Sequence, residues 1–114
     1  MPHIEIVPAS GRVVVRWKGH TVVDTKNALE LREGSYPPVL YTPREDADMS
    51  LLAPSPRHTT CPHKGEASYF SLRAEGATDD NAVWTYEKPK ADVEAIAGHL
   101  AFYPDKVEIT RQTA

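Results

Sequence analysis

The densest group of reactive side chains in the sequence lies in the segment Cys61-Pro62-His63-Lys64-Gly65. A cation near a thiol stabilises the thiolate, which is the nucleophilic form of cysteine. Lys64 follows Cys61 by three residues, and a proline after Cys61 restricts that cysteine to extended backbone. This spacing favours Cys61 as a nucleophile or redox-sensitive thiol with Lys64 as its charge partner. The alternative is that Cys61 is a small buried hydrophobic residue, the commoner state of a free cysteine.

Three side chains that can bind a metal, those of His58, Cys61 and His63, lie within the same stretch. Zinc accepts cysteine and histidine, and a carboxylate such as that of Asp46 would complete a tetrahedral site. The spacing matches no known zinc signature. We therefore predict no bound metal and no cofactor, and name these residues as the ones to examine if a metal is found.

A second group of polar residues follows Tyr41. Asp46 has the chemistry of a general base and is also a candidate to orient Lys64, whereas Arg44 is suited to clamp an anion. The alternative for both residues is a surface turn with an internal ion pair.

Aromatic side chains supply the other candidate ligand contacts. Trp84 and Tyr86 share one face of a predicted strand, and Tyr69 belongs to the neighbouring strand. Such rings usually build a core, but a tyrosine in a wall can place its hydroxyl in a pocket. The predicted ligand-binding residues are Tyr41, Arg44, His63, Tyr69, Trp84 and Tyr86, and the predicted catalytic residues are Cys61, Lys64 and Asp46.

The N-terminus offers one further nucleophile. Removal of Met1 would leave Pro2 as a secondary amine, the group that tautomerases use. The rest of the chain lacks the tautomerase pattern, so this interpretation rests on one residue alone.

These candidates must be positioned mainly by β-strands. Alternating β-branched and aromatic residues predict the strands, and glycine and proline mark the turns between them. We expect roughly seven to nine short antiparallel strands and one short helix near the C-terminus. The strands are predicted at 12–17, 21–25, 39–42, 49–53, 67–73, 82–86 and 107–110. Residues 4–6 are predicted as β-structure, 28–32 as a strand or extended segment, and 100–103 as extended chain.

Two connections matter most for the candidate site. Because Pro54 and Pro56 break regular structure, the segment from Pro54 to Gly65 is predicted to be a long structured loop that presents Cys61. Apolar residues at helical spacing after Pro89 predict the short helix, with Gly98 as its terminator.

Length and composition limit the class of protein. The 114 residues suit one domain, 1–114, and 40% hydrophobic with 25% charged residues is a globular composition. A net charge of -3 argues against a nucleic-acid partner. No apolar run approaches the roughly 20 residues that span a bilayer, and a lone cysteine without an export signal indicates the cytoplasm.

Four segments together resemble the family called domain of unknown function 427. They are Tyr41-Thr42-Pro43-Arg44-Glu45-Asp46, Cys61-Pro62-His63-Lys64-Gly65-Glu66-Ala67-Ser68-Tyr69, Trp84-Thr85-Tyr86-Glu87-Lys88-Pro89 and Leu100-Ala101-Phe102-Tyr103-Pro104. The resemblance covers nearly the whole chain and departs at His63, where the family often has an aromatic residue. It implies a small mainly β fold, tent-like or barrel-like.

Some classifications attach a nucleotidyltransferase label to that family. Gly34-Ser35 followed by Asp46 and Asp48 resembles the order of that class, whose paired aspartates hold metal ions. However, prolines follow Gly34-Ser35 where a helix would continue, and the aspartates lie in a charged turn.

Two functions fit these observations. In the first, the domain binds a small polar or anionic ligand in a pocket around the Cys61–Gly65 segment, with an activated Cys61. In the second, the same motif only stabilises its loop, and the domain is a structural or protein-interaction module, with a homodimer as one form.

Overall fold

The computed structural model describes residues 3–112, which form ten β-strands and three short 3-10 helices. The mainly β class predicted from the sequence is confirmed. The strands are β1 (Ile4–Pro8), β2 (Arg12–Trp17), β3 (His20–Thr25), β4 (Leu29–Glu33), β5 (Val39–Tyr41), β6 (Leu52–Cys61), β7 (Gly65–Ala74), β8 (Ala77–Thr85), β9 (Ala101–Phe102) and β10 (Glu108–Gln112). Pro2 lies outside the described residues, so its proposed role stays a prediction.

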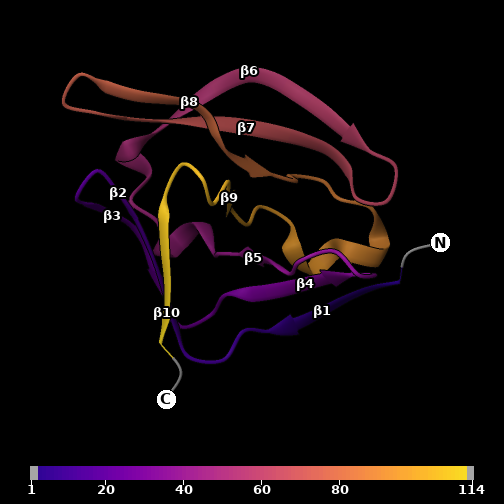
Figure 1. Ribbon diagram of the computed structural model, residues 1–114. Coiled ribbons are helices and arrows are strands. Elements are labelled where there is room, and N and C mark those ends of the chain that lie inside the picture. Colours follow the sequence, from indigo (N-terminus) through magenta and orange to yellow (C-terminus); the bar gives the residue numbers. More distant parts are fainter. Residues whose placement is uncertain (1–2, 113–114) are drawn as a thin grey trace.

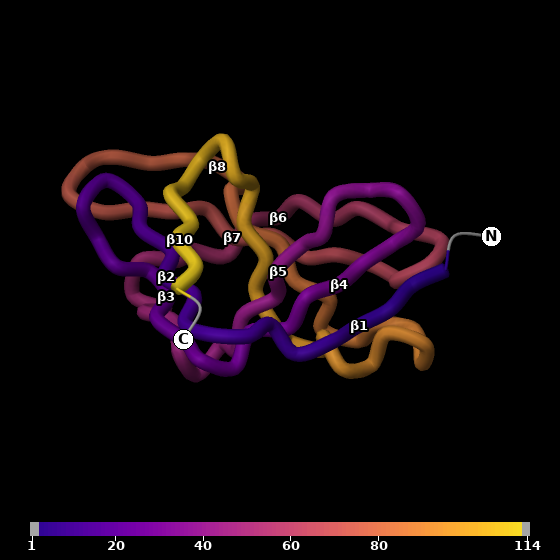
Figure 2. Tube along the Cα trace, turned by 60° about the horizontal axis from the view of Figure 1, so that its bottom comes forward, coloured from indigo at the N-terminus to yellow at the C-terminus, as the bar shows by residue number. Residues whose placement is uncertain are grey.

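The strands form three antiparallel sheets, none of which closes into a barrel. Their strand orders are β1-β4-β5, β10-β2-β3 and β6-β7-β8-β9. The four-stranded sheet lies above the other two (Figure 1). The two smaller sheets stand side by side beneath it. β5 forms the inner edge of one of them, and the chain of β9 lies between β5 and β10 (Figure 2).

Two groups of buried side chains fill the space between the sheets. The larger contains Val13, Val15 and Trp17 of β2, together with Leu72 and Val83 from the upper sheet. The smaller lies between β4–β5 and the other half of the upper sheet, and we call it the tyrosine cluster because it contains Tyr41, Tyr69 and Tyr86. The alternation of strand side chains explains both groups, since every second residue of a strand points to the same face.

The predicted loop from Pro54 to Gly65 is wrong. Most of it belongs to β6, and only the three residues Pro62, His63 and Lys64 connect β6 to β7. An edge strand tolerates prolines because one row of its backbone groups needs no partner. The ladder with β7 also shifts register between Ser55 and His58, which removes Pro56 from regular pairing.

The short helix near the C-terminus is present, but it is a 3-10 helix, η3 (Ala91–Ile96), interrupted at Val93. Its two buried residues, Val93 and Ile96, are three positions apart, the spacing that aligns side chains on such a helix. Gly98 follows with φ +71 and donates its backbone N–H to Tyr86. The other two helices are η1 (Arg44–Asp46) and η2 (Met49–Leu51). η1 lies in the charged segment 44–48, for which a turn or a single helical turn is expected, whereas η2 replaces the first part of the strand predicted at 49–53.

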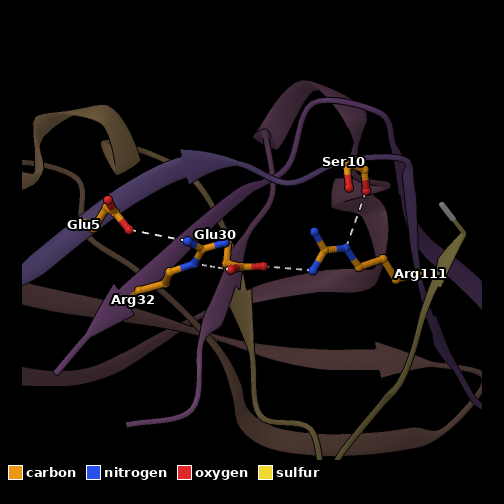
Figure 3. A network of polar contacts seen from close by, with 5 residues as sticks. All are labelled: Glu5, Ser10, Glu30, Arg32 and Arg111. Atoms are coloured by element: carbon orange, nitrogen blue, oxygen red, sulfur yellow. Dashed lines mark hydrogen bonds and ion pairs between the residues drawn. The ribbon is translucent and has the colours of Figure 1, made fainter. Parts of the chain in front are cut away.

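An ion-pair network joins the two smaller sheets. Glu30 of β4 accepts hydrogen bonds from Arg32 at 2.5 Å and from Arg111 of β10 at 2.8 Å. Arg32 also reaches Glu5, and Arg111 donates to the carbonyl of Ser10 (Figure 3). The Glu30 carboxylate therefore connects two sheets that share no strand.

Candidate functional site

The turn between β6 and β7 is fixed from the outside by the segment that precedes η3. Lys90 donates its backbone N–H to the Lys64 carbonyl at 2.9 Å and its ammonium group to the Pro62 carbonyl at 2.6 Å. Gly65 has φ +114, a conformation that residues with a Cβ rarely adopt. The proline, the glycine and the two contacts from Lys90 hold Cys61 and Lys64 in a defined turn.

Three side chains from separate parts of the chain meet beside this turn. The Lys64 ammonium lies 2.7 Å from a Glu33 carboxylate oxygen and 3.8 Å from the Cys61 sulfur. The side chains of Lys64 and Glu33 are only 12% and 14% exposed, so water screens their charges weakly. We call Cys61, Lys64 and Glu33 the thiol cluster.

The tyrosine cluster adjoins the thiol cluster, because Cys61 packs against it. The Trp84 indole N–H donates to the Tyr41 hydroxyl at 3.3 Å, which leaves the Tyr41 proton free to donate elsewhere. Burial raises the pKa of Tyr41 to about 12; the hydrogen bond with Trp84 acts in the opposite direction, and electrostatic interactions with Cys61 and Glu33 add to the effect of burial. Burial, followed by Tyr41 and Cys61, also raises the pKa of Tyr86. Both phenols therefore stay protonated at neutral pH as hydrogen-bond donors.

The outer end of the tyrosine cluster is more polar. The Tyr69 hydroxyl shares a 2.8 Å hydrogen bond with Thr59, and the Arg57 guanidinium stacks over the Tyr69 ring at 5.1 Å. Although burial acts in the opposite direction, the contacts with Thr59, Tyr103 and Arg57 lower the pKa of Tyr69. Burial and then Tyr69 raise the pKa of Tyr103 to about 12.

The structure thus brings six of the predicted residues together. The thiol cluster holds Cys61 and Lys64, and the adjoining tyrosine cluster includes Tyr41, Tyr69 and Tyr86 with Trp84 packed against it. His63 lies half-buried in the turn between Cys61 and Lys64. The assignment of catalytic and ligand-binding roles to these residues stays a prediction.

Arg44 contacts the face of β7 and β8 that carries Phe70 and Thr85. It donates to Thr85 at 3.3 Å and to the Gly98 carbonyl at 3.1 Å, pairs with Glu87, and stacks over Phe70. Thr85 and Trp84 are consecutive residues of β8, so their side chains point to opposite faces. Arg44 therefore does not share the face that carries Trp84.

Asp46 is also engaged elsewhere. Its carboxylate accepts a 2.7 Å hydrogen bond from Thr25 of β3. Asp48 accepts from the backbone N–H and the hydroxyl of Ser50 and so caps η2. Both aspartates of the nucleotidyltransferase-like pattern thus serve local structure, and Gly34-Ser35 lies in the turn after β4 rather than at a helix.

The three residues considered for metal binding, His58, Cys61 and His63, do not form a metal-binding group in the described part of the chain. His58 lies exposed at the register shift of β6, with Ser68 at 3.5 Å and Glu66 at 3.8 Å from its ring nitrogen. Within residues 3–112, no three His, Cys, Asp or Glu side chains are grouped closely enough to hold one metal ion. No helix in the same range is long and apolar enough to cross a bilayer.

Sequence reasoning missed Glu33, Arg57 and Thr59. A signal for Glu33 was available, because Leu29, Leu31 and Glu33 alternate along one face of β4; Leu31 belongs to the tyrosine cluster and Leu29 packs against it. A charged residue at the end of an apolar face indicates a buried ion-pair partner. Arg57 and Thr59 fell within the segment that was predicted to be a loop, where alternation was not considered.

The fold and the thiol cluster together define a mainly β domain with one enclosed cysteine–lysine–glutamate group. The chain matches the model of the family described as Domain of unknown function (DUF427) over residues 5–113, and it belongs to that family. No curated protein shows significant sequence similarity to the chain.

Proposed function

We propose that the domain binds a small polar ligand at the thiol cluster, with the Cys61 thiolate available as a nucleophile. The observation that carries this proposal is the 3.8 Å contact between the Cys61 sulfur and the Lys64 ammonium. A cation beside a thiol is the kind of partner that activates cysteine as a nucleophile.

The chemistry of the surrounding groups supports a ligand that offers acceptor oxygens. Tyr41 and Tyr86 supply neutral phenol donors next to the thiol, and donors aimed at a carbonyl or hydroxyl oxygen orient a polar ligand. The Lys64 charge is already balanced by Glu33. A neutral polar ligand therefore suits the cluster better than an anion, for which no uncompensated cation is left within it.

Alkylation kinetics test the proposal. In the Lys64→Gln variant the amide can still donate a hydrogen bond to Glu33, but the positive charge is lost. A pair of charges about 4 Å apart interacts by about 4 kcal/mol at an effective dielectric of 20. If a third of this interaction acts on the Cys61 thiolate, its loss in Lys64→Gln lowers the thiolate population, and with it the alkylation rate, about tenfold. Lys88→Gln is the matched control, because it removes the same charge from an exposed lysine nearby.

A second measurement separates reaction of the folded domain from reaction after opening. With a slope of about 1–2 kcal/mol per molar urea, 1 M urea raises the population of opened molecules several-fold. Alkylation of folded protein stays nearly constant in 1 M urea, whereas alkylation that requires unfolding accelerates by the same factor. Equal rates in Lys64→Gln and Lys88→Gln would overturn the proposed role of Lys64.

A structural role for the motif is the second candidate function, and a specific observation favours it. Lys90 anchors the turn through two hydrogen bonds, and Lys64 ties the same turn to β4 through Glu33. The motif would then hold the β6–β7 hairpin against β4 and the segment that contains Lys90. Alkylation of Cys61 that follows unfolding alone would support this role and reject the first.

A further inference from the structure

A cleft of about 560 Å³ lies apart from the Cys61 sulfur, between the two smaller sheets. Core residues of β2, Val13 and Val15, form part of its lining together with Leu40, Phe102 and Ile109. Val13 and Val15 are almost fully buried members of the larger core group. The cleft therefore reaches from the surface to the main core of the domain.

Two strand edges that do not pair explain why this cleft exists. β5 is an edge strand of one small sheet and β10 is an edge strand of the other. Pro37 and Pro38 precede β5, and Pro104 lies on the chain that leads to β10; all three line the cleft. Proline has no N–H to donate to a ladder, so these residues do not extend either edge. The chain of β9 lies between β5 and β10 (Figure 2).

The charge of the lining favours a neutral occupant. Glu33 is the one ionisable side chain of Asp, Glu, Lys, Arg or His type that lines the cleft, and its carboxylate is paired with Lys64 at 2.7 Å. A second charge, of either sign, would lose its hydration there without gaining a free partner.

The extent of apolar surface favours a small molecule over a protein. Among residues 3–112, Tyr36 and Tyr103 are the large hydrophobic side chains that are exposed, and Tyr36 stands at the cleft. A stable protein interface takes about 800 Å² from each partner, and the surface around the cleft offers no broad apolar area of that kind. A volume of 560 Å³ is within the range of small-molecule pockets.

The geometry points to a binding site for a neutral, ring-containing apolar small molecule in this cleft. The exposed prolines and Tyr36 present flat apolar faces at the surface, and buried branched side chains such as Val13 and Val15 line the base beneath a ring. The site is independent of Cys61 reactivity, although it shares Glu33 with the thiol cluster.

Amide NMR titration with three matched probes tests this assignment. Naphthylmethanol is neutral, naphthylmethylamine carries a positive charge, and naphthoate carries a negative charge at neutral pH. We expect naphthylmethanol to shift the resonances of Val13, Val15 and Ile109, and to bind at least about tenfold more tightly than either charged probe.

A pair of variants on one strand supplies the control. Ile109→Trp fills the cleft and is expected to weaken naphthylmethanol binding at least about tenfold. Thr110→Trp adds the same ring at the next, exposed position of β10 and is expected to leave binding unchanged. Cys61→Ser is also expected to bind normally, so failure here is distinguishable from failure of the proposed function.

Several outcomes would overturn the assignment. These are an absence of shifts at the lining residues, equal effects of Ile109→Trp and Thr110→Trp, or tightest binding of a charged probe. Shifts of the lining residues on dilution of the protein alone would show that a second copy fills the cleft instead. If Ile109→Trp does not fold, intermolecular NOEs between the probe and the valine methyl groups of the wild type decide.

Discussion

Two glutamates on opposite faces of β4 show how burial changes what an ion pair can do. Glu30 bonds to Arg32 and Arg111, whose side chains are 52% and 34% exposed. Glu33, three residues later, bonds to Lys64, and both members of that pair are less than 15% exposed. The two cations that bond Glu30 are therefore partly solvated, whereas both the cation and the carboxylate of the Glu33–Lys64 pair are shielded from water.

The groups that surround the two carboxylates also differ. The Glu30 network consists of guanidinium groups, carboxylates and a backbone carbonyl, so its role is to connect sheets (Figure 3). Beside Glu33 lie a thiol and an aromatic group whose phenols stay protonated. An enclosed charge pair acts strongly on a neighbouring ionisable group, whereas a solvated pair is screened. This difference is why the thiol cluster, and not the Glu30 network, is the candidate site.

The largest expected effect on the free energy of unfolding is that of Trp84, which packs against the tyrosine cluster. Trp84 packs against Tyr103 at 4.6 Å and meets Tyr41 edge-on at 6.4 Å. Trp84→Ala is expected to lower the free energy of unfolding by about 3 kcal/mol, because it leaves a cavity that its neighbours fill only partly. Urea denaturation measures the loss. A loss below about 1 kcal/mol would mean that the tyrosine cluster does not depend on this ring.

Breaking the enclosed pair is expected to have the next largest effect. Lys64→Met leaves the Glu33 carboxylate poorly solvated and unpaired, which costs about 2–3 kcal/mol of unfolding free energy. Arg32→Met is the matched variant in the exposed network, where about 1 kcal/mol or less is expected. Equal losses in the two variants would contradict the contrast between enclosed and solvated pairs.

The Glu30 network gives a smaller, pH-dependent effect. Hydrogen bonds from Arg32 and Arg111 lower the pKa of Glu30 below its ordinary value of 4.5. A lowered pKa stabilises the folded state above the unfolded value, and this stabilisation is lost as the pH falls through the folded value. Glu30→Gln is therefore expected to cost about 1–2 kcal/mol at pH 7. The difference from wild type should shrink on acidification below about pH 4.5.

Unfolding free energies of both proteins at neutral pH and at several acidic values check this prediction. A gap between wild type and Glu30→Gln that is constant across this range would show that ionisation of Glu30 contributes nothing to stability.

The smallest expected effect on stability is that of the thiol itself. Cys61 is half-buried at the end of an edge strand, so Cys61→Ser is expected to keep the fold and to change the free energy of unfolding by less than about 1 kcal/mol. Urea denaturation checks the value. A loss as large as that of Trp84→Ala would identify Cys61 as a core residue and not as part of a site.

The sequence predicted the strands well where β-branched residues or clear alternation marked them, as in β2, β3 and β7. It failed at β6, because prolines outweigh alternation in any local reading. That strand tolerates them only because it lies at a sheet edge and shifts register near Pro56. An edge position depends on which strands pair, and pairing is not encoded within the segment itself.

The same distinction applies to the candidate site. The closeness of Cys61 and Lys64 could be predicted, because they lie only three positions apart along the chain. The directions of Arg44 and Asp46 could not, since Arg44 turns to Thr85 on β8 and Asp46 turns to Thr25 on β3.

By itself, the sequence determined the mainly β character of this protein and the local turn that joins a thiol to an ammonium group. Only the tertiary structure decided that Glu33, 31 residues away from Lys64, closes the cluster and that Arg44 lies outside it. The physical reason is the distance along the chain over which each effect acts. Backbone preferences and alternation act over a few residues, whereas burial and charge pairing depend on which sheet faces meet.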